Sequence, residues 1–568
     1  MAHLRRLDGI ALLLVVALAA AGCTGGDGEE PDESGDGPVQ ITVLAEDIPA
    51  GLDYDGPAVP LPPTQTGIVN LMDTLIYYAP SGESEEGVQL LDFENFEARL
   101  AESWEFDEST LTWTFHLREG VVGCNGETFD ADDVVYTFAR AKSVSGEIPA
   151  GLITIQTASV EGFTNAAFEG DTELGNAVTK IDDFTVEIRQ SDPNGLFLPI
   201  MTHFATGIFD KETMEEHATE DDPWSHSYAN NENVPAFGPY CLESWEKDSE
   251  FIVTANPDYY RGPAAVDRIV YRKVPESANR VAAIQSGDAQ LVEHLTPKEF
   301  DSLRQADGVD VGGVLGNETL FVHLNWLTPP FDDTLVRQAV AYATPYDDII
   351  QTGYFGQAQR WEGQVPSSYP GFHRPETQYT YDPDRARELL AEAGYPDGEG
   401  LETYAEAFRI SYVAEKESTL GPIATVLQAS LRDVGFPSEL DPIPNSQFAD
   451  RMFVKRDLPF ALNDQEKPIA VDAAYALLIG HISIEAGAIA NNNNHANDEV
   501  DRLVLEAKVE PDEQRRNELM AEAQEILQNE PNWLPVVEWK TQWAFAESVQ
   551  GITWHPENSL RWYDLSVG

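Results

Sequence analysis

The alternation of strand and helix patterns along the whole chain constrains its fold most. Residues 111–117 and 184–188 alternate apolar with polar side chains, as half-buried strands do. Between them, Asp130 precedes an apolar-periodic segment that carries Val134 and Phe138, which predicts a capped helix. The same mixture continues to the C-terminus without a repeat of fixed period, and 568 residues are enough for two or three lobes with cores. The sequence therefore predicts an α/β fold.

Further elements follow from the same signals. Asp382-Pro383 places a capping acid before a proline at the first helical position, and Gly394 is a natural C-terminal glycine. The other expected elements are strands at 39–44, within 234–262 and within 533–545, and helices at 280–290, 332–343, 423–434 and 511–528.

The N-terminal stretch Leu12–Cys23 has the parts of an export signal. Arg5 and Arg6 precede a short apolar run that ends in small residues. The run is shorter than the roughly 20 apolar residues that a bilayer span needs. Its end, Ala20 to Cys23, resembles the bacterial lipoprotein box, so we expect a signal peptide at 1–22, a lipidated Cys23 and a flexible acidic tether at 23–38. The alternative is an ordinary cleaved signal and a free soluble protein; both place the rest outside the cytoplasm.

Acidic side chains far outnumber basic ones. Asp and Glu total 98 against 35 Lys and Arg, a formal net charge of −63. This excess argues against nucleic acid or an anionic membrane surface as a partner, since both need basic patches. The acids are dispersed along the chain, which favours a surface adapted to high salt and a halophilic source.

Two cysteines remain when Cys23 is set aside as the lipid site. Cys124 and Cys241 each lie in a strand-and-turn segment. In an oxidising compartment such a pair favours one disulfide, and the alternative is two buried free thiols.

Five motifs in order resemble one family. They are Trp113 to Arg118, Asn125 to Val134, Gly238-Pro239-Tyr240 with Ser244-Trp245 and Asn256 to Tyr259, Pro329 to Ala339, and Leu389 to Tyr395. Together they resemble the large extracytoplasmic solute-binding proteins of ABC importers, of the oligopeptide/dipeptide/nickel type (family 5). The resemblance spans residues 39–568, and we expect its aromatic positions, such as Trp113, to pack in cores.

The resemblance implies a periplasmic-binding-protein-like type II fold in its large three-lobed form. Lobe I would comprise 39–75, 235–315 and 531–568, lobe II would be an insertion at 76–234, and lobe III would be 316–530. Lobes I and III would close on the ligand by hinge bending.

The resemblance also places a ligand site. In peptide-binding members, a buried aspartate shortly before a proline pairs with the peptide α-ammonium. Asp464, next to Asn463 and before Pro468, occupies that place here. A desolvated carboxylate favours a cation that enters the same site. The neighbouring residues Ala461 and Leu462 differ from the Gly-Trp usual in peptide binders, so another amine-bearing or cationic solute remains open, as does a solvated-loop role for Asp464.

Three more residues of lobe III are candidates. His323 and Asn325 lie on the strand that opens the lobe and are expected to face the cleft. Trp361 lies in a loop of the same lobe, where an aromatic ring either covers a ligand or packs.

Catalytic signatures are missing from the sequence. It contains no Gly-x-Ser-x-Gly elbow, phosphate loop, His-Glu-x-x-His or Cys-x-x-Cys, and its 11 histidines lack metal-ligand spacing. We expect a non-enzymatic, monomeric receptor without cofactor or metal. It would be tethered outside the cell and deliver short peptides to ABC permease subunits. Alternatives are a nickel or other metal chelate, an oligosaccharide or haem as ligand, or a chemosensory role without transport.

Overall fold

The computed structural model describes most of the chain after residue 36. The described residues are 37–55, 62–144, 155, 158–163, 173–465, 467–468, 470–488 and 490–568. The Leu12–Cys23 leader and the Cys23 lipid site lie outside them. Residues Val39–Gly568 form one compact unit.

The unit is organised on an eleven-stranded mixed sheet. The strands follow the order β15-β14-β16-β12-β17-β11-β1-β10-β9-β8, and β13 pairs with β17. Their bounds are β1 Gln40–Ala45, β8 Tyr240–Glu246, β9 Glu250–Ala255, β10 Arg268–Lys273, β11 Leu291–Val292, β12 Val309–Leu324, β13 Ala358–Arg360, β14 Arg409–Val413, β15 Glu439–Ile443, β16 Phe460–Asn463 and β17 Trp533–Ala546.

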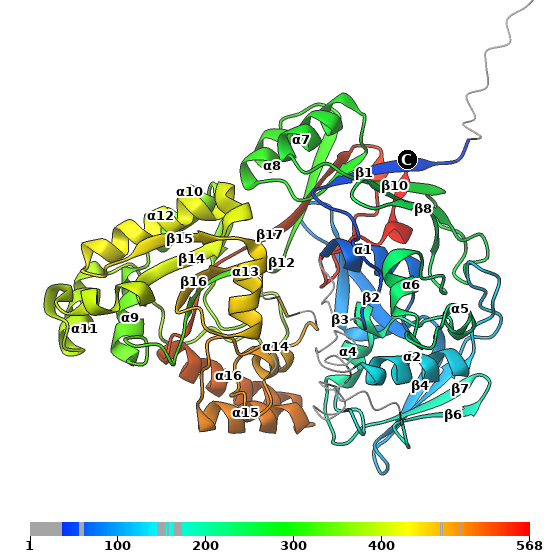
Figure 1. Cartoon of the computed structure of the whole chain (residues 1–568), viewed down its shortest axis with the longest axis horizontal. Coiled ribbons are helices and arrows are strands. Elements are labelled where there is room, and N and C mark those ends of the chain that lie inside the picture. Colours follow the sequence, from blue (N-terminus) through cyan, green and yellow to red (C-terminus); the bar gives the residue numbers. More distant parts are fainter. Residues whose placement is uncertain are drawn as a thin grey trace, which may run out of the picture. The chain divides into compact units, whose positions relative to one another are not determined.

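Two long antiparallel strands, β12 and β17, join the two halves of this sheet (Figure 1). The first residues of β12 pair with the last residues of β17, which also pair with β11. The last residues of β12 pair with the first residues of β17 on one side and with β16 on the other. We call the β8–β11 side, with β1, the first half and the β14–β16 side the second half. The pairing is irregular between Leu315 and Glu318, midway along β12.

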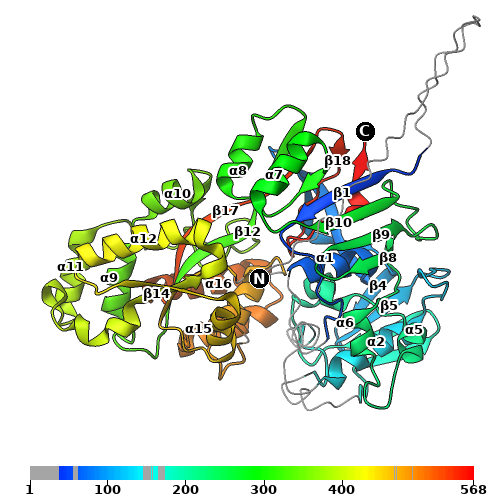
Figure 2. The same cartoon turned by 45° about the horizontal axis from the view of Figure 1, so that its top comes forward.

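Two smaller sheets accompany the first half, and Figure 2 shows the row of strands β1, β10, β9 and β8 beside them. One pairs β2 with β3, and the other has the order β4-β5-β7-β6. These strands are β2 Ile76–Glu83, β3 Gln89–Ala98, β4 Ala101–Asp107, β5 Thr112–Leu117, β6 Val178–Asp182 and β7 Thr185–Arg189; a two-stranded pair near the C-terminus is β18 Val549–Gln550 and β19 Ser566–Val567. The helices of this part are α1 Pro62–Leu71, α2 Ala131–Ser143, α4 Phe197–Met201, α5 Lys211–Glu216, α6 His226–Asn231, α7 Ser277–Ser286 and α8 Pro297–Leu303.

Helices also accompany the second half, and its core is separate. Leu320, Ile410 and Phe460 of its strands pack in one apolar cluster with the helical residues Val336 and Leu427. The helices are α9 Thr334–Ala343, α10 Tyr346–Tyr354, α11 Pro383–Glu392, α12 Glu417–Asp433, α13 Asn445–Ala449, α14 Ala473–Gly480, α15 Asp498–Val509 and α16 Glu513–Asn529. Residues of α14–α16 pack in a different cluster, which also contains β5 and α2.

The predicted helices and strands are present in the structure, with bounds close to those expected. Asp130 caps α2 in a reciprocal capping box with Asp133, and Gly287 ends α7 with φ of 81°. Helix α12 begins at Glu417, before the predicted start at residue 423, because Pro422 lies inside its first turns rather than ahead of it. Residues 491–493 are all asparagines, yet they form a buried loop.

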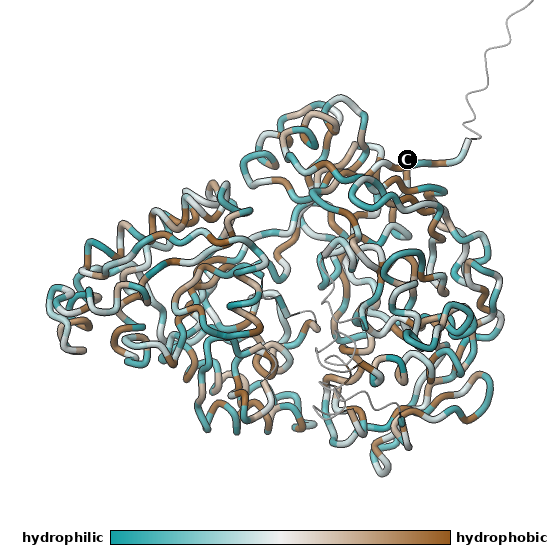
Figure 3. Tube along the Cα trace, viewed as in Figure 1, coloured by the Kyte–Doolittle hydropathy of each residue, from teal (hydrophilic) through white to brown (hydrophobic). Residues whose placement is uncertain are grey.

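Apolar residues are spread through the coloured tube of Figure 3 rather than gathered in one long run. Among the described residues, none of the helices combines the length and apolar character needed to cross a membrane.

Candidate functional site at the strand ends

The carboxyl ends of parallel strands from both halves of the main sheet point toward the middle of β12. Strands β1 and β11 are parallel, and β11 runs beside β17 toward the irregularity at Leu315. Strands β14 and β16 are parallel to each other, and β16 runs antiparallel to β12 toward Glu318. Ligands of open α/β sheets bind outside such strand ends. The residues that follow these strands are therefore the candidate site.

We call these residues the strand-end cluster. Its members are Glu46 after β1, His294 after β11, Glu318 within β12, Lys416 after β14, and Asp464 and Lys467 after β16.

Asp464 is bound by a lysine of its own chain. The Lys416 ammonium lies 2.8 Å from each oxygen of the Asp464 carboxylate. The two side chains differ in exposure, at 42% for Lys416 and 12% for Asp464. The carboxylate is thus largely covered, while its lysine partner is half-buried.

A second ion pair lies at the irregularity of β12. Lys467 Nζ is 2.6 Å from Glu318 Oε1, which also accepts a hydrogen bond of 3.1 Å from Asn558 Nδ2. Asn558 donates as well to Oδ1 of the buried Asn317. Asn317 in turn donates to the carbonyl of Pro468. These bonds fix the segment that carries Lys467 to the strand that joins the two halves.

The cluster interacts electrostatically across the two halves. Burial acts to lower the pKa of Lys416, but Asp464, and at longer range Glu318 and Glu46, raise it above its ordinary value. Desolvation by the surrounding protein lowers the pKa of His294, although the residue is exposed, and the positive charges of Arg280, Lys467 and Lys416 lower it further. Lys416 therefore stays charged, and the His294 imidazole stays neutral at pH 7.

Gly316 lies at the irregularity of β12. A Cβ atom at this position would lie 2.6 Å from the ring of Trp554. Only glycine allows this close approach, so the backbone at the junction of the two halves packs directly on an aromatic ring.

Asn463 is fully buried at the end of β16. Its Oδ1 accepts a hydrogen bond of 2.9 Å from the Gln465 backbone, while its Nδ2 has no partner in the described part of the chain. Asn463 thus shapes the turn that presents Asp464.

His323 and Asn325 are buried, which corrects the expectation that they face a cleft. His323 is enclosed within the sheet and bonds the Leu458 carbonyl through Nε2 at 3.0 Å. Its burial lowers the pKa to about 4, so the ring is neutral. Asn325 Nδ2 donates to the carbonyls of Arg456 and Leu458. Both residues anchor the segment before β16, because β16 lies next to β12 in the sheet.

Trp361 is buried against other aromatic side chains, which agrees with one of its two interpretations from the sequence. Its ring is 4% exposed and lies against Phe321, and its Nε1 donates to the Val365 carbonyl at 2.8 Å. Trp533 stacks on Phe321 in the same small cluster.

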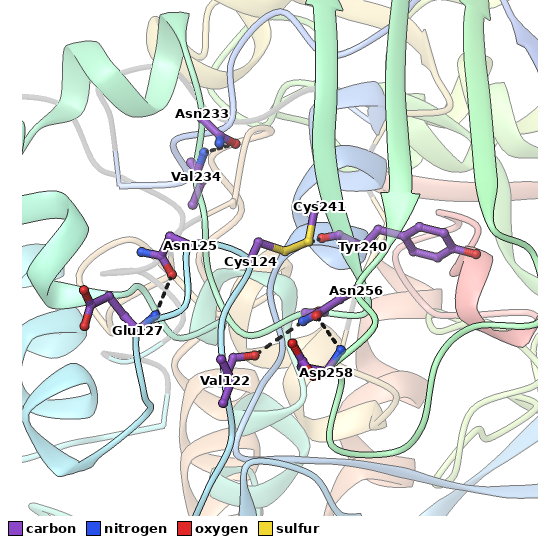
Figure 4. The surroundings of a disulfide bond; sticks show 11 residues. Val122, Cys124, Asn125, Glu127, Asn233, Val234, Tyr240, Cys241, Asn256 and Asp258 are labelled. Carbon is purple, nitrogen blue, oxygen red and sulfur yellow. Dashed lines mark hydrogen bonds between the residues drawn. A yellow bond between two sulfur atoms is a disulfide. The ribbon is translucent and has the colours of Figure 1, made fainter.

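Cys124 and Cys241 form a disulfide, away from the strand-end cluster (Figure 4). The bond joins the segment before α2 to β8. Asn256 lies beside it and donates to the Val122 carbonyl at 3.4 Å. The disulfide thus braces the outer edge of the first half.

Carboxylates of Asp133, Asp210 and Glu212 come together within 4.8 Å. Asp133 accepts the backbone N–H groups of Asp130 and Lys211, and Asp210 caps α5 through Thr213. These bonds account for the two buried acids as helix caps.

Sequence reasoning found Asp464 but missed Lys416, Lys467, Glu318, Glu46 and His294. The signal that could have found Glu46 is position, because it directly follows β1 and so lies at a strand end. Lys416, Lys467 and His294 lie two to four residues beyond their strands, and Glu318 lies within β12. Which strands share an edge does not follow from periodicity.

This mixed α/β arrangement on one large sheet is the fold of the periplasmic-binding-protein class. The chain belongs to the bacterial extracellular solute-binding proteins, family 5, whose family model matches residues 95–466.

Relatives and solved structures agree with this assignment. The chain is 25% identical over 479 residues to the dipeptide-binding protein of Escherichia coli K12, covering 82% of this chain and 85% of the relative. It is 26% identical to heme-binding protein A of Haemophilus influenzae over 488 residues, covering 83% and 84%. The periplasmic binding protein DppA of Helicobacter pylori, solved with the peptide STSA, has a similar fold, with a TM-score of 0.77 and 23% identity over 93% of this chain and 98% of that one.

Proposed function

We propose that this protein captures short peptides outside the cell and delivers them to the permease of an ABC importer. The observation that carries the proposal is Asp464, a largely covered carboxylate at a strand end, where the converging strands of both halves of the sheet meet. Such a carboxylate binds an α-ammonium group through charge-assisted hydrogen bonds. The peptide backbone then pairs with strand edges independently of side-chain identity.

Closure around the peptide would use the junction at Gly316. Lobe I (39–75, 235–315 and 531–568) and lobe III (316–530) meet there, and lobe II (76–234) accompanies lobe I. Bending at the irregular pairing of β12 would bring Glu46 and His294 toward Lys416 and Asp464.

Co-purified ligands and a thermal-shift panel test the proposal. The mature protein is purified from cells, small molecules are identified by mass spectrometry, and peptides, sugars, metal chelates and haem are compared. A peptide at a hundredfold excess over Kd stabilises by about 2.7 kcal/mol. Stabilisation by sugars, with no response to peptides, would overturn the peptide assignment.

Asp464→Asn tests the site itself. We expect peptide affinity to fall at least tenfold, because an amide cannot replace the carboxylate as partner of an ammonium. The matched control is Asp450→Asn, which removes an exposed acid paired with Lys455. Equal peptide affinity in wild type and Asp464→Asn would remove Asp464 from the site.

Haem is the second candidate ligand, because one relative is named a heme-binding protein. A Soret-band titration of the purified protein distinguishes it from peptide: saturable haem binding together with no peptide response favours this alternative.

We also propose a lipid on Cys23 that keeps the receptor near its permease and raises its effective concentration there. Intact-mass measurement of membrane-extracted protein and of Cys23→Ser tests this anchor. The net charge of −63 leads us to propose a salt-adapted surface, for which the unfolding temperature rises between low and molar salt.

A further inference from the structure

A lysine from the helices of the second half binds two residues that accompany the first half. Lys508 lies in the last turn of α15, and its Nζ is 3.3 Å from Asp192 Oδ2. The same ammonium group donates to Ser159 Oγ. None of the three residues belongs to β12 or β17. The two sides of the molecule are therefore connected at a second place, apart from the strand pair that joins the halves of the sheet.

The loops that receive Lys508 are held in place by their own hydrogen bonds. The Ser159 carbonyl accepts from the Ser191 N–H at 2.7 Å and from Ser191 Oγ at 3.0 Å. Asn194 Nδ2 donates to the Ala158 carbonyl at 2.9 Å. Ser159 itself has φ of 57°, a left-handed conformation that is uncommon for serine and persists where the surroundings impose it. The two acceptors for the Lys508 ammonium are thus positioned by bonds that do not involve Lys508.

A second cation from the same group of helices faces the same loop. Arg516 of α16 pairs with Asp472 Oδ2 of its own side at 2.6 Å, and a Cβ atom at Gly195 would lie 4.0 Å from Arg516 Cζ. Lys508 differs from Arg516, because in the described part of the chain its ion pair is made only with the opposite side. Apolar residues of both sides also share one buried cluster, among them Val160, Leu196, Leu503 and Ala507.

The receiving loop belongs to the body of the first half. Asp192 follows β7 of the β4-β5-β7-β6 sheet, and the Cys124–Cys241 disulfide joins the segment before α2 to β8 of the main sheet. Bending at the irregular pairing of β12 would therefore carry α15 away from Asp192. The Lys508 side chain is 13% exposed and that of Asp192 is 42% exposed, so water can solvate both when they separate.

We propose that Lys508 is a latch between the two sides and sets how often the protein opens to admit or release its solute. The inference rests on the bending at Gly316 that is part of the proposed function, and it does not depend on which solute is bound. Neither Lys508 nor Asp192 belongs to the strand-end cluster, so the latch stabilises the closed form to a similar extent with and without a ligand. Loss of the latch therefore speeds both entry and release and changes affinity little.

Double electron–electron resonance between two spin labels tests the latch without any ligand. One label is attached at Glu108→Cys, in the exposed turn between β4 and β5, and the other at Glu513→Cys, at the exposed start of α16. Cys23→Ser in the same full-length chain removes the remaining thiol. In Lys508→Gln we expect the ratio of long to short label separations to rise by about threefold or more, as loss of a partly exposed ion pair allows.

Charge reversal separates the ion pair from other effects of substitution. Lys508→Glu places a like charge opposite Asp192 and should populate long separations more than Lys508→Gln does. Adding Asp192→Lys to Lys508→Glu restores opposite charges and should return the distribution toward that of the wild type. Lys180→Gln is the matched control and should change nothing, because Lys180 pairs with Asp132 and Asp183 on its own side of the molecule.

The outcomes distinguish the latch from the proposed peptide function. The same label separations in wild type, Lys508→Gln and Lys508→Glu overturn the latch, and so does a shift that the reversed pair leaves uncorrected. Stopped-flow binding of the tripeptide Ala-Ala-Ala should show both rate constants raised in Lys508→Gln, with Kd within threefold of the wild type. If no peptide binds, the peptide function fails while the label separations still decide on the latch. Thermal unfolding verifies that each variant is folded, and Asp192→Asn takes the place of a Lys508 variant that is not.

Discussion

Two ion-pair sites of this molecule use the same chemistry at different depths. Arg140 of α2 binds Asp53 Oδ1 at 2.8 Å and Asp55 Oδ2 at 3.0 Å, and all three side chains are 0% exposed. Lys416 binds Asp464 at the same distance of 2.8 Å but remains 42% exposed. Removing one partner is severe only where water cannot replace it. Losing the cation should therefore cost much more stability at the first site than at the second.

The residue types agree with this difference. The planar Arg140 guanidinium bridges two acids and lies 4.2 Å from the centre of the Phe209 ring. His226 Nδ1 adds a further contact of 2.5 Å to Asp53. Lys416 has a flexible stem and a single compact charge, so it holds its one acid less rigidly than Arg140 holds two.

Arg140→Met should have the largest effect. It leaves Asp53 and Asp55 buried without a cation, so we expect a loss of about 3–5 kcal/mol in the free energy of unfolding. Urea unfolding measures it, with Arg385→Met, from an exposed pair with Glu388, as the control. A loss below about 1 kcal/mol would contradict the view that the buried Arg140 site contributes more to stability than the Lys416 site.

Removing the disulfide should have the next largest effect. Cys124 and Cys241 are 117 residues apart, so the bond restricts a long loop of the unfolded chain. For Cys124→Ser with Cys241→Ser we expect a loss of about 2–4 kcal/mol. Peptide affinity should stay within threefold, because the bond lies away from the strand ends. Weaker peptide binding in the folded variant would show that the two regions are coupled.

Asp55 should make stability depend on pH. Burial raises its pKa to about 7, with the Arg140 charge acting against this shift and the Asp53 charge adding to it. Because its ordinary value is 3.8, the folded protein holds this proton more strongly than the unfolded chain does. The stability that Asp55 contributes is present below about pH 4 and is lost as pH rises to about 7. In Asp55→Asn, the free energy of unfolding should depend less on pH over this interval. The same dependence on pH in wild type and variant would refute the assignment.

Asp464→Asn should have the smallest effect on stability. Lys416 is exposed enough to be hydrated when its partner is lost, so we expect a change of no more than about 1 kcal/mol. Thermal unfolding without ligand measures the stability change of Asp464→Asn, and Asp53→Asn is measured for comparison. A loss comparable to that of Asp53→Asn would place the Lys416 pair among the fixed parts of the fold.

Local sequence signals predicted the helices and strands well, but they could not predict which distant strands pair. Asp130, Gly287 and Asp382 mark helix ends through caps that form within a few residues, so the sequence carries them directly. Asp464 meets Lys416, 48 residues away in the sequence, only because β14 pairs with β16. His323 was misjudged for the same reason: its strand is buried on both sides by neighbours that the alternating pattern does not name.

The strand order has a consequence for how the chain is made. Strand β1 near the start of the chain pairs with β11, and β11 pairs with β17, whose paired residues Ala544 and Phe545 lie near the end. The first half of the main sheet therefore stays incomplete until almost the whole polypeptide has been synthesised. Pairings of such long sequence separation form slowly. In a nascent chain, β11 would therefore lack one of its two neighbours until β17 has been made.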